Sequence, residues 1–272
     1  MNAERIRLWA AVVLYGSNAS DSPACRYLQT HARQDAGFLL FDNTDCPESN
    51  AAWCRENGFT YLGGEGNLGL SVAYNRCLSY LDGLKAQGRI LWLDDDSLPE
   101  DGLIDRLLRE DAPILAPIVL SGRRILSPSR AFGTRMLRFR SERAALTSRS
   151  ERLTAINAGL CVRLALYRDY RYDERVFLDG LDHRFLRDMR AKGFHPKVID
   201  ARLAQRFSGD ETPPQTQALR RYRIFLRDYH ILYRERPLFW RRLALRRALR
   251  LTLSYRSLAF FQAYRAERRR HD

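Results

Sequence analysis

Short apolar runs alternate with segments of helical pattern along the first hundred residues. The runs cover residues 8–15, 38–41, 59–62 and 89–93, and the first of them, LWAAVVLY, is apolar without interruption. A continuous apolar run of this length is typical of a strand buried on both faces of a parallel sheet. Strands that alternate with helices predict an α/β fold with a mostly parallel sheet flanked by helices.

Each of these runs ends in polar or glycine residues, namely Gly16-Ser17-Asn18, Asp42-Asn43, Gly63-Gly64 and Asp94-Asp95-Asp96. The carboxyl ends of parallel strands meet at one edge of the sheet, where open α/β folds bind their ligands. We therefore expect a nucleotide site at this edge. The glycine-rich stretch 63–69 fits it, since glycine lets backbone N–H groups approach phosphates.

The three consecutive aspartates after the fourth run carry the strongest chemical signal. Adjacent carboxylates repel one another unless a cation or strong donors neutralise them. Oxygen ligands of this kind suit Mg²⁺ or Mn²⁺, so the stretch predicts a site for a divalent cation and a diphosphate. The alternative is a solvated turn that caps the next helix, because Asp and Ser favour both structures.

The positive charge of the chain is concentrated at its C-terminal end. The net charge is +14 over 272 residues, and residues 211–272 hold 16 arginines and five acidic residues, which leaves only +3 for the first 210. This distribution predicts a nearly neutral domain, 1–212, followed by a basic helical extension, 213–272, with Pro213-Pro214 at the boundary. It disfavours a nucleic-acid surface that spans the whole protein.

The basic extension mixes arginine with bulky apolar residues at helical spacing over 220–236 and 238–253. Such helices suit the surface of an anionic membrane, whereas the alternative is a helix pair packed on the domain with solvated arginines. No run reaches the ~20 apolar residues of a spanning helix, and the first apolar run has the pattern of a strand rather than of a signal peptide. We therefore expect a cytoplasmic protein at the inner face of the plasma membrane.

Four segments together resemble family-2 glycosyltransferases of the GT-A fold. Gly66-Asn67-Leu68-Gly69 with Ala73 and Asn75 is similar to an N-x-G-x-x-x-A-x-N stretch, and 93–97 is similar to a D-x-D motif. Residues 172–194 resemble an F-D-E-x-F-F-I-D-x-x-D segment with its R-x-x-x-K-G-Y continuation, and 221–228 a Tyr/Arg-rich helix. The resemblance covers residues 11–237 and is closest to the rhamnosyltransferase-like branch that builds cell-surface polysaccharides.

This resemblance implies an inverting, metal-assisted transfer of a sugar from a nucleoside-diphosphate sugar to a polysaccharide or lipid-linked acceptor. The donor it favours is dTDP-rhamnose, while a UDP-hexose or UDP-galactofuranose stays open. It implies that Asp96 binds Mg²⁺ or Mn²⁺, that Asp94 lies beside the metal or the ribose, and that Asp182 is the general base. A carboxylate base fits the chemistry, because a sugar hydroxyl must lose its proton as it attacks.

The resemblance also implies a set of residues around the nucleotide sugar: Tyr15, Gly16, Asn18, Asp42, Asn43, Asn67, Gly69, Asp94, Asp95 and Asn157. Members of the family often have a histidine as a further metal ligand beyond the last strand. Here that region reads Gln205-Arg206-Phe207, and Arg206 is predicted to contact the diphosphate instead.

Several alternatives remain at the level of the sequence. Asp182 could cap the following helix, Asp179 could be the base, and Asp42-Asn43 could form only an Asx turn. A nucleotidyltransferase would favour a basic residue in the first strand–helix loop, and residues 16–20 contain none. A binding protein without activity would tolerate the loss of Asp96 or Asp182, but both are present.

Overall fold

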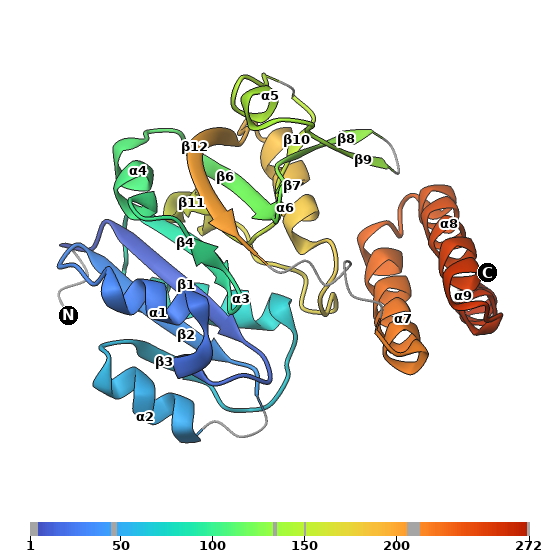
Figure 1. The fold of residues 1–272 in the computed structure, drawn as a ribbon, viewed down its shortest axis with the longest axis horizontal. Helices are drawn as coiled ribbons and strands as arrows, with labels where there is room; N and C mark the ends of the chain where they lie inside the picture. Colours follow the sequence, from blue (N-terminus) through green and yellow to red (C-terminus); the bar gives the residue numbers. More distant parts are fainter. Residues whose placement is uncertain (1–4, 45–47, 133–134, 150, 206–212, 271–272) are drawn as a thin grey trace.

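The computed structural model describes residues 5–44, 48–132, 135–149, 151–205 and 213–270 (Figure 1). Its centre is a sheet with the strand order β3-β2-β1-β4-β11-β6-β12-β5, in which β7 also pairs with β6. Helices cover both faces of this sheet, and the helices of the C-terminal extension stand beside it (Figure 1). The predicted α/β class with a mostly parallel sheet is confirmed.

The N-terminal half follows the predicted alternation of strands and helices. Its parallel strands are β1 (Leu8–Leu14), β2 (Ala36–Asp42), β3 (Thr60–Gly63) and β4 (Arg89–Asp94). The helices between them are α1 (Pro23–Thr30), α2 (Glu48–Glu56) and α3 (Leu70–Gly83), with a short 3₁₀ turn at Ala19–Asp21. The carboxyl ends of β1, β2 and β4 therefore lie side by side.

The position of β1 explains its uninterrupted apolar sequence, because all seven residues of this strand are buried. Trp9 and Val13 pack with residues of α3 and α6 (Leu181–Ala191) on one face of the sheet. Leu8 and Val12 pack with residues of α1 and α4 (Leu103–Arg109) on the other. Successive side chains of a strand point to opposite faces, so a strand covered on both sides has no polar position.

The second half departs from a simple parallel pattern. Strand β11 (Cys161–Arg163) runs antiparallel between β4 and β6 (Ile114–Ser121), and β12 (Lys197–Ala204) pairs parallel with β6. The helix that follows the aspartates, α4, begins only at Leu103, so the aspartates do not cap it. Leu98–Pro99 instead forms β5, which pairs with the end of β12.

The remaining strands extend one side of the molecule. Strand β7 (Arg124–Ser127) pairs with β6, and a separate small sheet has the order β10-β8-β9. Its strands are β8 (Ser129–Phe132), β9 (Arg135–Arg138) and β10 (Leu153–Thr154), and the other elements here are α5 (Glu142–Leu146) and a 3₁₀ turn at Leu164–Tyr167.

The basic extension folds as three helices, α7 (Gln215–Leu232), α8 (Pro237–Tyr255) and α9 (Ala259–Arg269). They share a core of their own that contains Tyr222, Phe225, Trp240, Ala244 and Phe260. Much of the apolar surface that the pattern assigned to a membrane is thus buried inside the extension. Along the described ranges, we find no helix whose length and apolar character would let it span a bilayer.

Candidate active site

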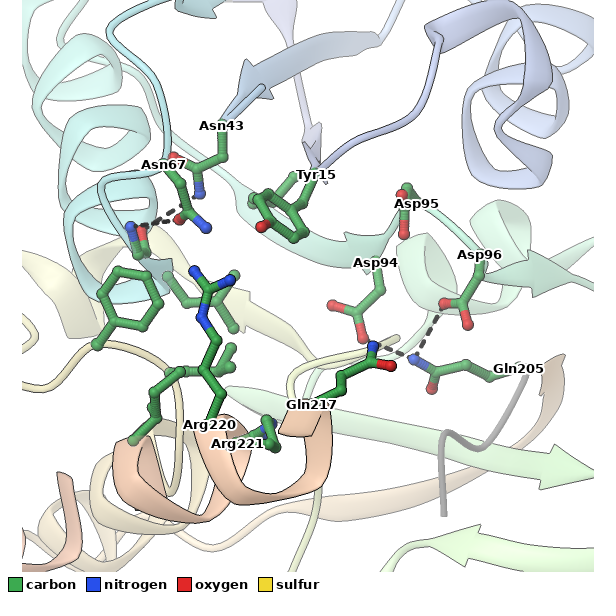
Figure 2. Close-up of a pocket in the computed structure, with 16 residues that line it drawn as sticks. Tyr15, Asn43, Asn67, Asp94, Asp95, Asp96, Gln205, Gln217, Arg220 and Arg221 are labelled. Carbon is green, nitrogen blue, oxygen red and sulfur yellow. Dashed lines mark hydrogen bonds between the residues drawn. The ribbon is translucent and has the colours of Figure 1, made fainter. Parts of the chain in front are cut away.

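A pocket of about 430 Å³ opens at the carboxyl ends of β1, β2 and β4, at the edge of the sheet predicted for a nucleotide (Figure 2). Seven of the predicted site residues line it: Tyr15, Asn43, Asn67, Gly69, Asp94, Asp95 and Asp96. The opposite wall comes from loop residues Phe177 and Leu178 and from the first turns of α7. The basic extension is therefore part of the pocket.

The aspartates lie at the end of β4 and in the turn that follows it. Gln205, the residue after β12, donates from Nε2 to Asp94 Oδ2 at 2.6 Å and to Asp96 Oδ1 at 3.2 Å (Figure 2). Burial, together with the charge of Asp96, raises the pKa of Asp94 to about 7. The two neighbouring carboxylates thus destabilise one another, and a single amide group bridges them.

This arrangement fits a divalent cation whose coordination is completed by a ligand. Within the described part of the chain, no three His, Cys, Asp or Glu side chains form a ready-made metal site. Mg²⁺ is commonly held by one or two carboxylates together with substrate phosphates and water. Two neighbouring carboxylates with mutually unfavourable charge, open to a pocket, match that donor set.

The glycine loop before α3 forms one wall of the pocket. Asn43 Oδ1 accepts from Leu68 N at 3.2 Å, and Asn67 Oδ1 accepts from Gly69 N at 3.1 Å, so both side chains fix the loop. Gly69 has a φ of +86°, and a Cβ there would lie 2.6 Å from Phe177 O. Leu70 N donates to the same carbonyl at 2.7 Å. Glycine is required at 69 because the loop with Phe177 packs against it.

The loop after β1 supports the aspartates from another side. Ser17 Oγ donates to Asp95 Oδ2 at 2.7 Å, which makes Asp95 a connection between two strand ends as well as a lining residue. Tyr15 is 59% exposed and lines the pocket, so its ring is accessible to a ligand. Gly16 and Asn18 belong to the same loop but do not line the pocket, and Asn18 Nδ2 donates to Asp21 at 3.1 Å.

Asp42 is buried at the end of β2 and does not line the pocket. Its buried carboxylate accepts from Thr44 N at 2.9 Å, Thr44 Oγ1 at 2.6 Å, Asn50 Nδ2 at 2.8 Å and Tyr61 Oη at 3.3 Å. The contact with Thr44 N is the Asx turn that the sequence left open. Asp42 orders the end of β2, and its neighbour Asn43 faces the pocket.

The loop 177–179 is fastened to α7 by two carboxylates. Asp228, fully buried on α7, accepts from the backbone N–H groups of Phe177 at 3.0 Å, Leu178 at 2.7 Å and Asp179 at 2.9 Å. Asp179 in turn forms a two-pronged ion pair with Arg221 of α7, in which Nη2 lies 2.6 Å from Oδ1. The alternative base Asp179 is thereby occupied by a structural cation.

Asp182 is the second residue of α6, whose N-cap is Gly180, so the alternative interpretation of Asp182 as the N-cap is wrong. Its Oδ1 accepts from His183 N at 2.6 Å. Asp182 does not line the pocket, but its charge acts on Asp94 and on Tyr74. Asn157 is buried, hydrogen-bonds Tyr74, and has an Oδ1 without a partner among the described residues.

The pocket has four polar lining residues that were not predicted as ligand contacts: Gln205, Gln217, Arg220 and Arg221. Gln205 could have been found, because it follows a strand directly. The other three lie on α7, and Figure 2 shows Gln217 and Arg220 reaching from this helix into the pocket. Arg206, predicted to contact the diphosphate, lies outside the described residues.

Comparison with known proteins places the fold. No family model matches the chain, and no curated protein sequence matches it. Among solved structures, a mannosyltransferase from Pyrobaculum calidifontis with GDP-mannose and Mn²⁺ is 13% identical, with a TM-score of 0.55 over 97% of this chain and 74% of the other. Glucosyl-3-phosphoglycerate synthase from Mycobacterium tuberculosis, solved with Mn²⁺, UDP and its product, is 14% identical, with a TM-score of 0.53 over 83% and 79%. The chain therefore has the Rossmann-like GT-A fold of these glycosyltransferases.

Proposed function

We propose that this protein is an inverting, metal-assisted glycosyltransferase that uses a nucleoside-diphosphate sugar. The observation that carries the proposal is the pocket in which Asp94 and Asp96 face Asn43, Gly69 and Arg220. Carboxylates for a cation and donors for phosphate thus converge at the edge where an open α/β sheet binds nucleotides. The shared fold with two transferases solved with Mn²⁺ and nucleotides supports this.

The chain's own residues can be given distinct roles in this reaction. Tyr15 and Asn43 would contact the nucleoside, and Asp96 with Asp94 would hold the divalent cation. When bound, the cation would supply positive charge to the leaving diphosphate. Arg220 would add a second positive charge from α7.

The acceptor hydroxyl requires a base, for which we propose Asp182. Asp179 is engaged by Arg221, which leaves Asp182, whose charge acts on Asp94, as the better proton acceptor. Asn157 Oδ1, which has no hydrogen-bond partner among the described residues, would accept a hydrogen bond from a hydroxyl of the donor sugar. A single displacement by the acceptor inverts the sugar and needs no covalent intermediate.

The donor that we propose is dTDP-rhamnose, on the basis of the motifs that resemble the rhamnosyltransferase-like branch. A panel of nucleotide sugars, read by thermal unfolding with and without Mn²⁺, tests this, because a ligand that binds only the folded state raises the melting temperature. The panel contains dTDP-rhamnose, UDP-glucose, UDP-galactose, UDP-galactofuranose and GDP-mannose. A melting temperature unchanged by every nucleotide in Mn²⁺ would overturn the proposed function.

We further propose that the protein binds the inner face of the plasma membrane through α8. Three leucines of this helix are exposed, namely Leu238 at 66%, Leu249 at 49% and Leu253 at 79%. Leu258, just after the helix, is exposed as well. Arginines lie close to these leucines in the sequence. Apolar side chains beside arginines suit an anionic lipid surface.

Flotation with phosphatidylglycerol vesicles tests this membrane site on the full chain. Leu249→Gln with Leu253→Gln should weaken binding several-fold, since both leucines would leave the lipid. Leu137→Gln, an exposed leucine on β9, is the control. Equal binding of all three proteins would exclude α8 as the membrane-facing element.

A further inference from the structure

A second hollow of about 740 Å³ lies between α7 and α9, outside the pocket described above. Four arginines line it, Arg220, Arg223, Arg227 and Arg270, together with a single acidic residue, Glu267. We call this hollow the arginine groove. The positive charge gathered in one hollow calls for an anionic ligand.

The arginines of this groove are only partly neutralised. Arg270 Nη1 lies 3.4 Å from Glu267 Oε2, and Arg227 Nε lies 3.7 Å from Asp228 Oδ1. Asp228, however, already accepts three backbone N–H groups of the loop 177–179. Arg220 and Arg223 have no ion-pair partner among the residues that the structure describes. Guanidinium groups with free donors match the oxygens of a phosphate.

Apart from Thr216, the rest of the lining is apolar and consists of Leu219, Ile224, Leu226, Ala263 and Ala266. None of these described lining residues is aromatic. Proteins that hold single-stranded nucleic acid usually stack bases on aromatic rings, so the groove is poorly suited to that ligand. A hydrocarbon chain attached to a phosphate fits both the charge and the apolar wall.

The arginine groove is adjacent to the donor pocket. Arg220 and Ile224 of α7 line both the arginine groove and the donor pocket. The two hollows therefore lie on either side of the first turns of this helix. Figure 2 shows Arg220 extending from α7 toward the part of the pocket formed by Asn67 and Asn43. A ligand in the groove would thus lie one helix away from the aspartates that hold the donor.

We propose that the arginine groove binds the phosphate or diphosphate of an acceptor that carries an apolar chain. This assignment rests on the proposed function, since it names the chemical class of the acceptor for the same transfer. Arg223 and Arg227 contact the phosphate oxygens, while Leu219 and Ala263 contact the start of the chain. The sugar-accepting end then reaches past Arg220 into the donor pocket.

Calorimetric titration with farnesyl diphosphate tests the groove on the full chain. EDTA is present throughout, so that the diphosphate does not bind through a cation at Asp94 and Asp96. We expect Arg223→Gln with Arg227→Gln to weaken binding about tenfold or more, because two charge-assisted contacts are lost. Arg223→Gln alone should weaken binding several-fold. This single variant keeps Arg227, whose side chain lies beside Asp228.

A matched control and two further ligands separate the possible explanations. Arg265→Gln with Arg269→Gln removes the same charge from exposed positions of α9 outside the groove and should leave binding unchanged. Inorganic pyrophosphate should bind more weakly than farnesyl diphosphate, because it lacks the apolar chain. Phosphatidylglycerol vesicles should bind the wild type and the groove variants alike.

The assignment is overturned if wild-type protein does not bind farnesyl diphosphate, or if the groove variants bind it as the wild type does. A loss confined to phosphatidylglycerol vesicles would make the groove a site for membrane headgroups instead. Nucleotide binding in Mn²⁺ is measured on the same proteins. If it is absent from the wild type while the groove variants behave as expected, the proposed function fails but the anion site stands.

Discussion

Asp228 is fully buried on α7, whereas Asp94 is half-buried at the edge of the pocket, and the surroundings of these two carboxylates differ. Asp228 accepts three backbone N–H groups from within the chain, and Asp42 is similarly saturated. Asp94 lies beside Asp96, shares one amide donor with it, and has its pKa raised to about 7. The first kind of carboxylate stabilises the fold, whereas the second kind is stabilised only when something enters the pocket.

The largest effect is expected from Asp182→Asn. This variant tests whether Asp182, which belongs to neither of these two kinds of carboxylate, is the base. Transfer should fall about 10²–10⁴-fold, because an amide cannot accept the acceptor proton. Nucleotide binding and the melting temperature should stay unchanged. Initial rates with the donor found in the panel measure this, and Asp179→Asn serves for comparison. Full activity of Asp182→Asn would show that the base lies elsewhere.

Asp228→Asn tests the structural kind of carboxylate. We expect the free energy of unfolding to fall by about 3 kcal/mol, since three buried N–H groups would lose a charged acceptor. Urea denaturation measures the change. Asp169→Asn, at an exposed position, should change stability by less than about 0.5 kcal/mol. Equal stabilities of the two variants would contradict the role of Asp228.

Arg221→Gln also weakens the contact between α7 and the loop 177–179, because Asp179 loses its ion-pair partner. The side chain of Arg221 is 40% exposed, so water replaces part of the lost interaction, and we expect a loss of about 1 kcal/mol. The double variant with Asp179→Asn should regain part of this stability, because no unpaired charge remains. A double variant no more stable than Arg221→Gln would indicate that the pair adds little.

The smallest effect on stability is expected from Asp96→Asn. Removing one of two repelling carboxylates should leave the metal-free protein as stable as the wild type, or slightly more stable. The rise in melting temperature that Mn²⁺ and nucleotide produce together should be lost. A large destabilisation without metal would place Asp96 with Asp228 among the structural carboxylates.

The sequence was sufficient for the parts of the fold that depend on local pattern. The apolar runs located β1 to β4, and the polar residues after them located most of the pocket. The antiparallel β11 and the short β5 could not be predicted, because their direction is decided by partners on distant strands.

The contribution of the basic extension to the pocket was also beyond local pattern. A Tyr/Arg-rich helix was recognised at 221–228, but the contacts of Asp228 join residues about fifty positions apart in sequence. Asn75, although part of a recognised motif, donates to Tyr172 O at 2.9 Å and orders a loop. A motif thus indicated which residues matter without showing whether each serves binding or structure.

The contacts of Asp228 have a consequence for hydrogen exchange. The amides of Phe177, Leu178 and Asp179 belong to a loop, where exchange with solvent is ordinarily fast. Their common acceptor is fully buried on α7, so these three amides exchange only when the loop separates from that helix. Their exchange rates therefore report the free energy with which the extension is docked to the sheet domain. They would also register any ligand that binds across this junction.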